Sequence, residues 1–280
     1  MNLGAIPRPK DNRDFKLGTI SAPSTDKPVE FKPDLVKYPK FDQQQQPACG
    51  AHAGAMLVEV LRSNELGTML QQSPRFIWTL LKQANGVYND TYQISDGTDM
   101  RSIMKVLQGA GVCSFALGGN DTSLSLTDYA NMPITAEMND DAANKVIQSY
   151  AFEDLPTVDQ LTDAIWKYKA IILLIRCDNG FFRTTTPTFT QPLYGHFVVA
   201  AGYDANGIYI IDSTEADFSK SVKYIGNQYI SFIKEVGTTM ELTEEQIKIV
   251  KQMTTVANKY PSILSQIMTA VSNLINLWKK

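Results

Sequence analysis

The spacing of the apolar residues changes near the middle of the chain, and this change restricts the folds that the sequence can adopt. In the first part, apolar residues recur three and four positions apart, the spacing of amphipathic helices. The predicted helices span residues 49–63, 73–84 and 100–112. In the second part, short apolar runs rich in β-branched residues predict strands over 170–177, 195–203 and 207–213. A helical part followed by a β-rich part predicts an α+β fold.

The two ends of the 280-residue chain differ in character from this body. Residues 1–40 are rich in proline, which predicts an extended arm lying on the body. Residues 241–280 begin with a capping box and continue with one apolar helical face, so we expect a C-terminal amphipathic helical hairpin. This hairpin is expected to pack on the body, on a second subunit or on a partner.

Composition excludes several classes of function. The net charge is −3 and no long run of one sign occurs, which argues against nucleic-acid binding. No apolar run of about 18 residues predicts a transmembrane helix. The first residues contain no apolar signal segment, so we expect a cytoplasmic or otherwise non-secretory protein; export by another route and association with a virion stay open. Three scattered cysteines and two histidines predict free thiols, no metal site and no cofactor.

Cys49 lies where a polar segment, "FDQQQQPA", meets the first predicted helix. Free N–H groups and the helix dipole at such a position stabilise a thiolate. The residue is then either a small buried spacer or a nucleophile, and a nucleophile requires a base. His52 and His196 are the two histidines available. His52 lies one helical turn after Cys49, where it either packs inside the helix or competes as the base.

His196 begins a predicted strand and Asp212 ends the next one. A hairpin loop with an odd number of residues would direct both side chains to the same face. We expect a three-residue loop, 204–206, with Gly207 in the left-handed conformation. A carboxylate beside an imidazole fixes its tautomer and orientation, which is the third role in a nucleophile–base–orienter set. The alternatives are a core histidine and a capping aspartate.

Three segments together resemble the papain-like cysteine peptidases. The segment "DQQQQPACGAHAGA" is similar to their nucleophile segment, with Gln43 six residues before Cys49. The segment "YGHFVVAAGYDANGIYIIDS" is similar to the one that carries the histidine and the third member. Between them, Gly97-Thr98 stands where the family has a Gly-Gly pair. The resemblance covers roughly residues 4–233.

The resemblance implies a two-lobed fold. A helical lobe, about 41–125, would carry Cys49, and an antiparallel β-barrel lobe, about 126–240, would carry His196 and Asp212. It also implies a cysteine peptidase that acts on proteins or peptides. The implied roles are Cys49 as nucleophile, His196 as base, Asp212 as orienting group, Gln43 as oxyanion-hole donor, and Gly97, Thr98 and Gly195 as substrate-binding residues.

The chain also departs from the family pattern. Gly50 replaces the usual tryptophan, Gln46 replaces a cysteine that normally forms a disulfide, and "DSTE" lacks the aromatic residue that usually follows the third member. Asp212 replaces the usual asparagine, as in the related bacteriocin-leader peptidases. Two alternatives therefore stay open: an inactive binding or structural module, and an amidase or acyltransferase acting on isopeptide or cell-wall bonds. Gly97 could equally be a turn glycine.

Overall fold

The computed structural model describes residues 4–11, 14, 16–17, 24–38, 40–83, 88, 93–182, 184–191 and 193–240. The chain divides into two compact units, and one of them comprises Met1–Lys10 and Phe15–Met240. The fold and the site described below lie in this unit. The hairpin predicted over 241–280 lies outside the described residues. Among the described helices, none combines the length and the apolar character needed to cross a bilayer.

Helices dominate the chain as far as Ala143. They are α2 (Cys49–Leu66), α3 (Pro74–Lys82), α4 (Met100–Gly109), α5 (Phe115–Gly118), α6 (Leu126–Ala130) and α7 (Ala136–Ala143). The three predicted helices are thus confirmed, although α4 ends earlier than expected. Ser73 caps α3, since its Oγ accepts a hydrogen bond from the backbone N–H of Phe76 at 3.2 Å. The helical elements extend past residue 125, and the first strand begins at Ser149.

The β-rich part is one antiparallel sheet of six strands in the order β1-β6-β2-β3-β4-β5. The strands are β1 (Ser149–Asp154), β2 (Ile171–Cys177), β3 (Tyr194–Asp204), β4 (Gly207–Ile211), β5 (Val222–Gly226) and β6 (Ile233–Met240). One further helix, α8 (Val158–Tyr168), separates β1 from β2. The short 3₁₀ helices are η1 (Leu35–Lys37), η2 (Asn179–Phe181), η3 (Phe218–Lys220) and η4 (Asn227–Phe232). Helix η4 separates β5 from β6.

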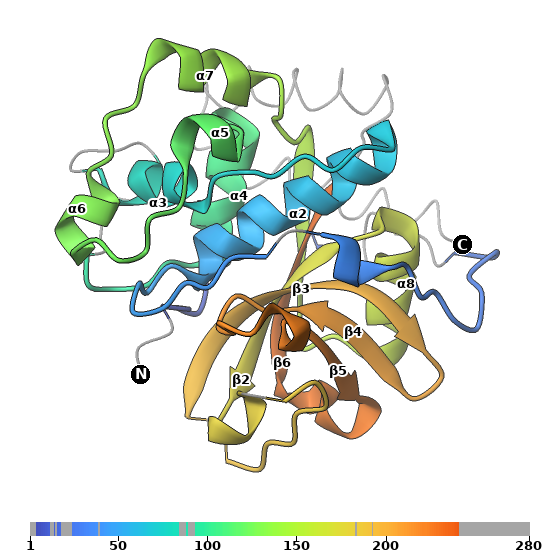
Figure 1. Cartoon of the computed structure of the whole chain (residues 1–280). Coiled ribbons are helices and arrows are strands. Elements are labelled where there is room, and N and C mark those ends of the chain that lie inside the picture. The colour runs from blue at the N-terminus through green and yellow to red at the C-terminus, as the bar shows by residue number, and fades with distance from the viewer. Residues whose placement is uncertain are drawn as a thin grey trace, which may run out of the picture. The chain divides into compact units, whose positions relative to one another are not determined.

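The sheet is not closed, so the expected β-barrel is corrected to an open sheet with β1 and β5 as its edges. Helix α2 runs between the helices α3 and α4 and the sheet, whereas α8 packs directly on the sheet (Figure 1). Leu57 of α2 shares one apolar core with Phe197 and Val199 of β3. Because this helix covers an apolar face of the sheet, that face is buried without the strands curling onto themselves.

The small residues of α2 allow close packing around its first turn. A Cβ atom added at Gly50 would lie 2.6 Å from the Thr98 side chain and 2.7 Å from that of Ile103 in α4. Thr98 and Ile103 thus fill the space that a larger residue after Cys49 would need. A tryptophan at position 50 would not fit against these side chains.

The hairpin between β3 and β4 directs two side chains to one face in a different way from the one expected. Asp204 pairs with Gly207, so the connection has two residues, and Gly207 does not adopt a positive φ. The expected three-residue loop is therefore wrong. The register instead shifts by one residue between Ala200 and Gly202, a β-bulge. Side chains alternate between the two faces along a strand, and the extra residue shifts this alternation by one position. His196 and Asp212 therefore lie on the same face of the sheet.

Candidate active site

Cys49 is the first residue of α2 and is fully buried. Ala48 precedes it as N-cap and offers no side-chain hydrogen bond, so the first N–H groups of the helix are not capped by a side chain. Cys113 and Cys177 are also buried free thiols, as expected. Burial raises the pKa of the Cys113 thiol to about 11, which keeps it protonated at neutral pH.

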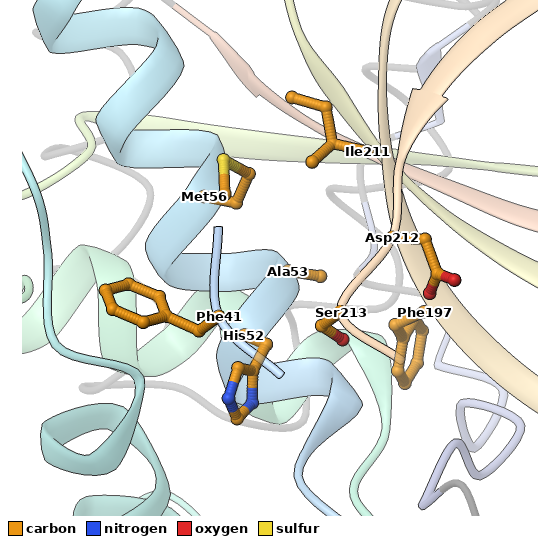
Figure 2. Close-up of a pocket in the computed structure, with 8 residues that line it drawn as sticks. All are labelled: Phe41, His52, Ala53, Met56, Phe197, Ile211, Asp212 and Ser213. Atoms are coloured by element: carbon orange, nitrogen blue, oxygen red, sulfur yellow. The ribbon is translucent and has the colours of Figure 1, made fainter. Parts of the chain in front are cut away.

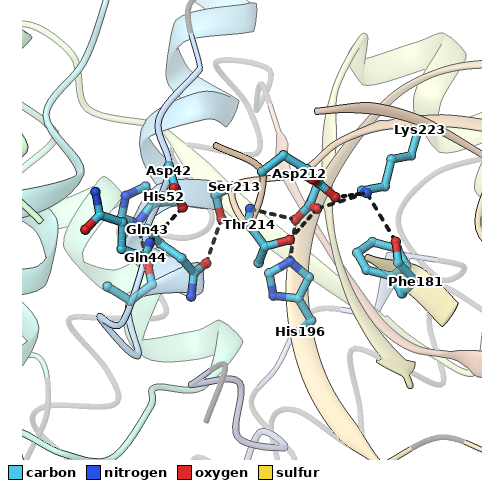
Figure 3. A network of polar contacts seen from close by, with 12 residues as sticks. Asp42, Gln43, Gln44, His52, Phe181, His196, Asp212, Ser213, Thr214 and Lys223 are labelled. Carbon is cyan, nitrogen blue, oxygen red and sulfur yellow. Dashed lines mark hydrogen bonds and ion pairs between the residues drawn. The ribbon is translucent and has the colours of Figure 1, made fainter. Parts of the chain in front are cut away.

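The structure brings His196 and Asp212 together in a buried pair (Figure 3). The Nε2 atom of His196 lies 2.6 Å from Oδ1 of Asp212, and both side chains are completely buried. Nδ1 of His196 is buried without a hydrogen-bond partner among the described residues. Since Asp212 occupies Nε2, Nδ1 is the ring nitrogen available to the Cys49 thiol, which raises the pKa of the imidazole.

The charges around His196 favour its protonated form. Burial lowers the pKa of the imidazole, but the Asp212 carboxylate, its hydrogen bond and the Cys49 thiol together raise it to about 9. The pKa of Asp212 is lowered because the His196 and Lys223 cations and the hydrogen bonds to Asp212 outweigh its burial. An imidazolium between a carboxylate and a thiol is the arrangement that a thiolate nucleophile requires.

Two residues that sequence reasoning missed hold the far oxygen of Asp212 (Figure 3). Thr214 Oγ1 donates a hydrogen bond of 2.6 Å to Oδ2, and its backbone N–H lies 3.2 Å from Oδ1. Nζ of Lys223 lies 3.5 Å from Oδ2. The "DSTE" segment pointed to Thr214 only as the place of a missing aromatic residue. Lys223 carried no local signal, because only the pairing of β5 with β4 brings it near Asp212.

Gln43 is buried beside the pair. Its Oε1 accepts a hydrogen bond of 2.8 Å from Ser213 Oγ, and its Nε2 donates to the Gln46 carbonyl at 3.0 Å. The backbone N–H of Gln43 also donates to the Ser213 carbonyl at 2.8 Å. Two segments distant in the sequence are thereby joined, and the second N–H of the amide is left to act as a donor.

His52 does not approach Cys49 as a base. Its Nδ1 lies 2.9 Å from the Ala48 carbonyl oxygen, and its Nε2 lies 3.2 Å from Nδ2 of Asn120. Asn120 is held in turn by the hydroxyl of Tyr129 at 2.6 Å. Burial, opposed by the hydrogen bond to Ala48 and reinforced by His196, lowers the pKa of His52 to about 4. His52 is therefore a neutral structural residue that fixes the N-terminus of α2.

The N-terminal arm contacts all three predicted substrate-binding residues. Thr98 N–H donates to the Gly4 carbonyl at 2.7 Å, and Ile6 N–H donates to the Thr98 carbonyl at 2.9 Å. This pattern forms a parallel bridge between Ala5 and Thr98. A Cβ atom at Gly97 would overlap the Gly4 carbonyl, and one at Gly195 would lie 2.7 Å from the Ala5 carbonyl oxygen.

A small pocket lies between α2 and the end of β4 (Figure 2). It is lined by Phe41, His52, Ala53, Met56, Phe197, Ile211, Asp212 and Ser213. Asp212 lines this pocket but Cys49 and His196 do not, so the pocket is not the surface on which Cys49 and His196 meet. Within the described part of the chain, no group of three or more histidine, cysteine or carboxylate side chains is arranged to hold a metal ion.

The sequence matches no family model and no curated protein sequence. Among solved structures it is similar to xylellain, a cysteine protease from Xylella fastidiosa, with a TM-score of 0.70 and 19% identity over 86% of this chain and 97% of that one. The chain has the papain-like fold.

Two further papain-like structures cover an equal share of the chain. Digestive procathepsin L2 from the larval midgut of Tenebrio molitor gives a TM-score of 0.62 and 14% identity, over 86% of this chain and 75% of that one. The cysteine protease and lectin-like domains of Cwp84 from Clostridium difficile give a TM-score of 0.62 and 14% identity, over 86% and 56%. At these identities the likeness concerns the papain-like fold, and the chemistry has to be argued from the residues.

Proposed function

We propose that this chain is a cysteine peptidase that hydrolyses peptide bonds. One observation carries the proposal: His196 is bonded through Nε2 to Asp212 at 2.6 Å and keeps Nδ1 for Cys49 at the start of α2. This order of groups is the nucleophile–base–orienter arrangement, built from three separate elements. The sequence and the fold support the same assignment.

In the proposed reaction, the Cys49 thiolate attacks the carbonyl carbon of a peptide bond. The backbone N–H of Cys49 and the free amide N–H of Gln43 stabilise the oxyanion that forms. The His196 imidazolium then gives its proton to the leaving amine, and a water molecule, deprotonated by the neutral imidazole, hydrolyses the acyl-enzyme. Asp212 holds the ring in the required orientation in both steps.

The position of the arm suggests how substrate binding is controlled. Gly4 and Ile6 use the backbone groups of Thr98 to which a substrate strand would bind. Gly4 also packs against the Pro47 carbonyl, two residues before Cys49. A peptide substrate must therefore displace residues 4–6, and the described form is a covered state of the peptidase.

Cleavage of an unfolded protein tests the proposal. The full chain, a chain without residues 1–7, and Cys49→Ala forms of both are incubated with a reduced, unfolded protein, and the fragments are identified by mass spectrometry. We expect cleavage by the shortened chain, weaker cleavage by the full chain, and none by either Cys49→Ala form. Absence of cleavage in every sample, with the fold intact by circular dichroism, would favour the inactive module. Cleavage confined to isopeptide or cell-wall cross-links would favour the amidase.

A further inference from the structure

A buried lysine lies behind the His196–Asp212 pair. Lys223 projects from β5, and its side chain has no exposed surface. Lysine is almost never fully buried unless its charge is paired, so this position needs an explanation. Nζ lies 2.5 Å from Glu215 Oε1, 3.0 Å from the Thr184 carbonyl and 3.1 Å from the Phe181 carbonyl. The ammonium group is therefore fully bonded in a fixed position.

This fixed ammonium group faces the orienting carboxylate. Its nitrogen lies 3.5 Å from Oδ2 of Asp212, the oxygen that does not contact His196. The same cation lies over the Phe181 ring at 5.0 Å, and that ring packs edge-on against the His196 imidazole at 5.7 Å. Lys223 thus faces Asp212, and Phe181 lies against both Lys223 and His196.

An aspartate in the third position has a consequence that an asparagine lacks. A full negative charge at 2.6 Å stabilises the imidazolium and makes it a weaker acid toward the leaving amine. A nearby cation offsets part of that charge. The titratable groups around Asp212 are His196 of β3, Glu215 after β4, Lys223 of β5, Cys49 and His52 of α2, and Cys177 of β2.

We propose that Lys223 is a positioning residue for the Asp212–His196 pair. It holds Oδ2 of Asp212 and offsets part of the negative charge of that carboxylate. Glu215 neutralises part of the lysine charge and so limits this effect on Asp212. The role of Lys223 in catalysis rests on the proposed function. The electrostatic effect of Lys223 on the Asp212–His196 pair does not depend on that function. Removing the lysine charge and removing the glutamate charge must then act on His196 in opposite directions.

The test is an NMR titration of the His196 ring in the full chain, which needs no catalysis. The two histidines are resolved in long-range ¹H–¹⁵N spectra, and His196→Ala identifies the signals of His196. We expect the pKa of His196, about 9 in the native chain, to rise by about half a unit or more in Lys223→Met and to fall by a similar amount in Glu215→Gln. Glu215→Gln preserves the side-chain shape, so it decides the matter alone if Lys223→Met does not fold.

Lys40→Met is the matched control, because Lys40 is also buried and donates to two carbonyl oxygens, those of Val36 and Tyr38. It should lower the melting temperature without moving the pKa of His196.

Peptide hydrolysis by Lys223→Met should show kcat lowered about tenfold with KM unchanged. A pKa of His196 unchanged within about 0.2 unit in Glu215→Gln, and in Lys223→Met if it folds, would overturn the proposal and leave the cluster a structural one. The failure of peptidase activity in the native chain would instead count against the proposed function and leave the titration interpretable.

Discussion

At the scale of single residues, the charge of Asp212 determines how His196 is protonated. That charge raises the pKa of the His196 imidazole to about 9, against the effect of burial. In Asp212→Asn the hydrogen bond to the ring can remain while the charge is lost. The imidazolium then deprotonates at lower pH, so the alkaline limb of the kcat/KM profile should move down by about one to two pH units.

The profile is measured on the chain without residues 1–7, with a fluorogenic peptide between pH 5 and 10. Asp217→Asn is the control, because Asp217 is an exposed carboxylate in the same loop. It should leave the limb where it is. An unmoved limb in Asp212→Asn would mean that Asp212 does not control His196.

Gln43 gives a second prediction at this scale. Gln43→Ala removes the proposed oxyanion donor and should lower kcat about 10²–10³-fold, with a much smaller change in KM. Ser213→Ala removes only the hydrogen bond to Gln43 Oε1 and should cost less. Steady-state kinetics on the same peptide compares them. Equal and small effects of the two variants would remove Gln43 from the oxyanion hole.

Sequence reasoning can propose site residues where the supporting signals are local, and the catalytic roles of Cys49 and Gln43 stay predictions. Cys49 and Gln43 lie within one segment, and the capping signal of Ser73 is read directly from its neighbours. Lys223 and Thr214 were missed because nothing in their own segments distinguishes them. Their role exists only once β4 and β5 pair and Asp212 has been placed.

At the scale of elements, α2 contains a buried carboxyl group that predicts a pH-dependent stability. Glu59 has no exposed surface, and burial raises its pKa to about 8 despite the hydrogen bond from Gln72 N–H and the nearby Lys40. A carboxyl whose pKa is raised on folding contributes stability below its unfolded value, near 4.5, and this contribution is lost as the pH rises toward 8. The native chain should therefore lose stability across this window.

Glu59→Gln removes the titration. Between pH 4.5 and pH 8, the native chain should lose on the order of 3 kcal/mol of unfolding free energy relative to Glu59→Gln. Urea unfolding at both pH values measures it. Glu65→Gln, at an exposed position of the same helix, should show no such change. A pH-independent difference for Glu59→Gln would show that Glu59 is ionised in the folded chain.

The elements themselves were largely predictable, and their connections were less so. Helical spacing located the start of α2, and β-branched runs located β2, β3 and β4. The hairpin loop was predicted with the wrong length. A two-residue loop with a bulge at Ala201 and a loop with an odd number of residues both place His196 and Asp212 on the same face of the sheet. A single sequence gives no means to choose between them. The open sheet was also missed, since barrel closure depends on contacts between distant strands.

At the scale of the whole molecule, the arm occupies the backbone groups that are proposed to bind a substrate. Arg8 anchors it: the guanidinium lies 2.7 Å from Asp154 and 4.3 Å from the centre of the Phe152 ring, and the backbone N–H donates to Glu235 at 3.0 Å. Arg8→Ala should loosen residues 4–6 and raise kcat/KM for a peptide about tenfold, mainly through a lower KM.

Lys32→Ala is the control, because Lys32 forms a largely exposed ion pair elsewhere in the arm. It should leave the kinetics unchanged. Progress curves for both variants and the native chain, at low and moderate salt, measure the effect. If Arg8→Ala and the native chain have the same KM, residues 4–6 do not compete with substrate.

The pH dependence of Cys49 alkylation shows whether Cys49 and His196 form a thiolate–imidazolium pair. The chain without residues 1–7 and its His196→Ala variant are treated with iodoacetamide between pH 4 and 10, and modification of Cys49 is followed by peptide mass spectrometry. A thiolate–imidazolium pair predicts rapid alkylation that is already at a plateau below about pH 7 and is lost in His196→Ala. A single rise near pH 8.5 in both proteins, the behaviour of an ordinary thiol, would contradict it.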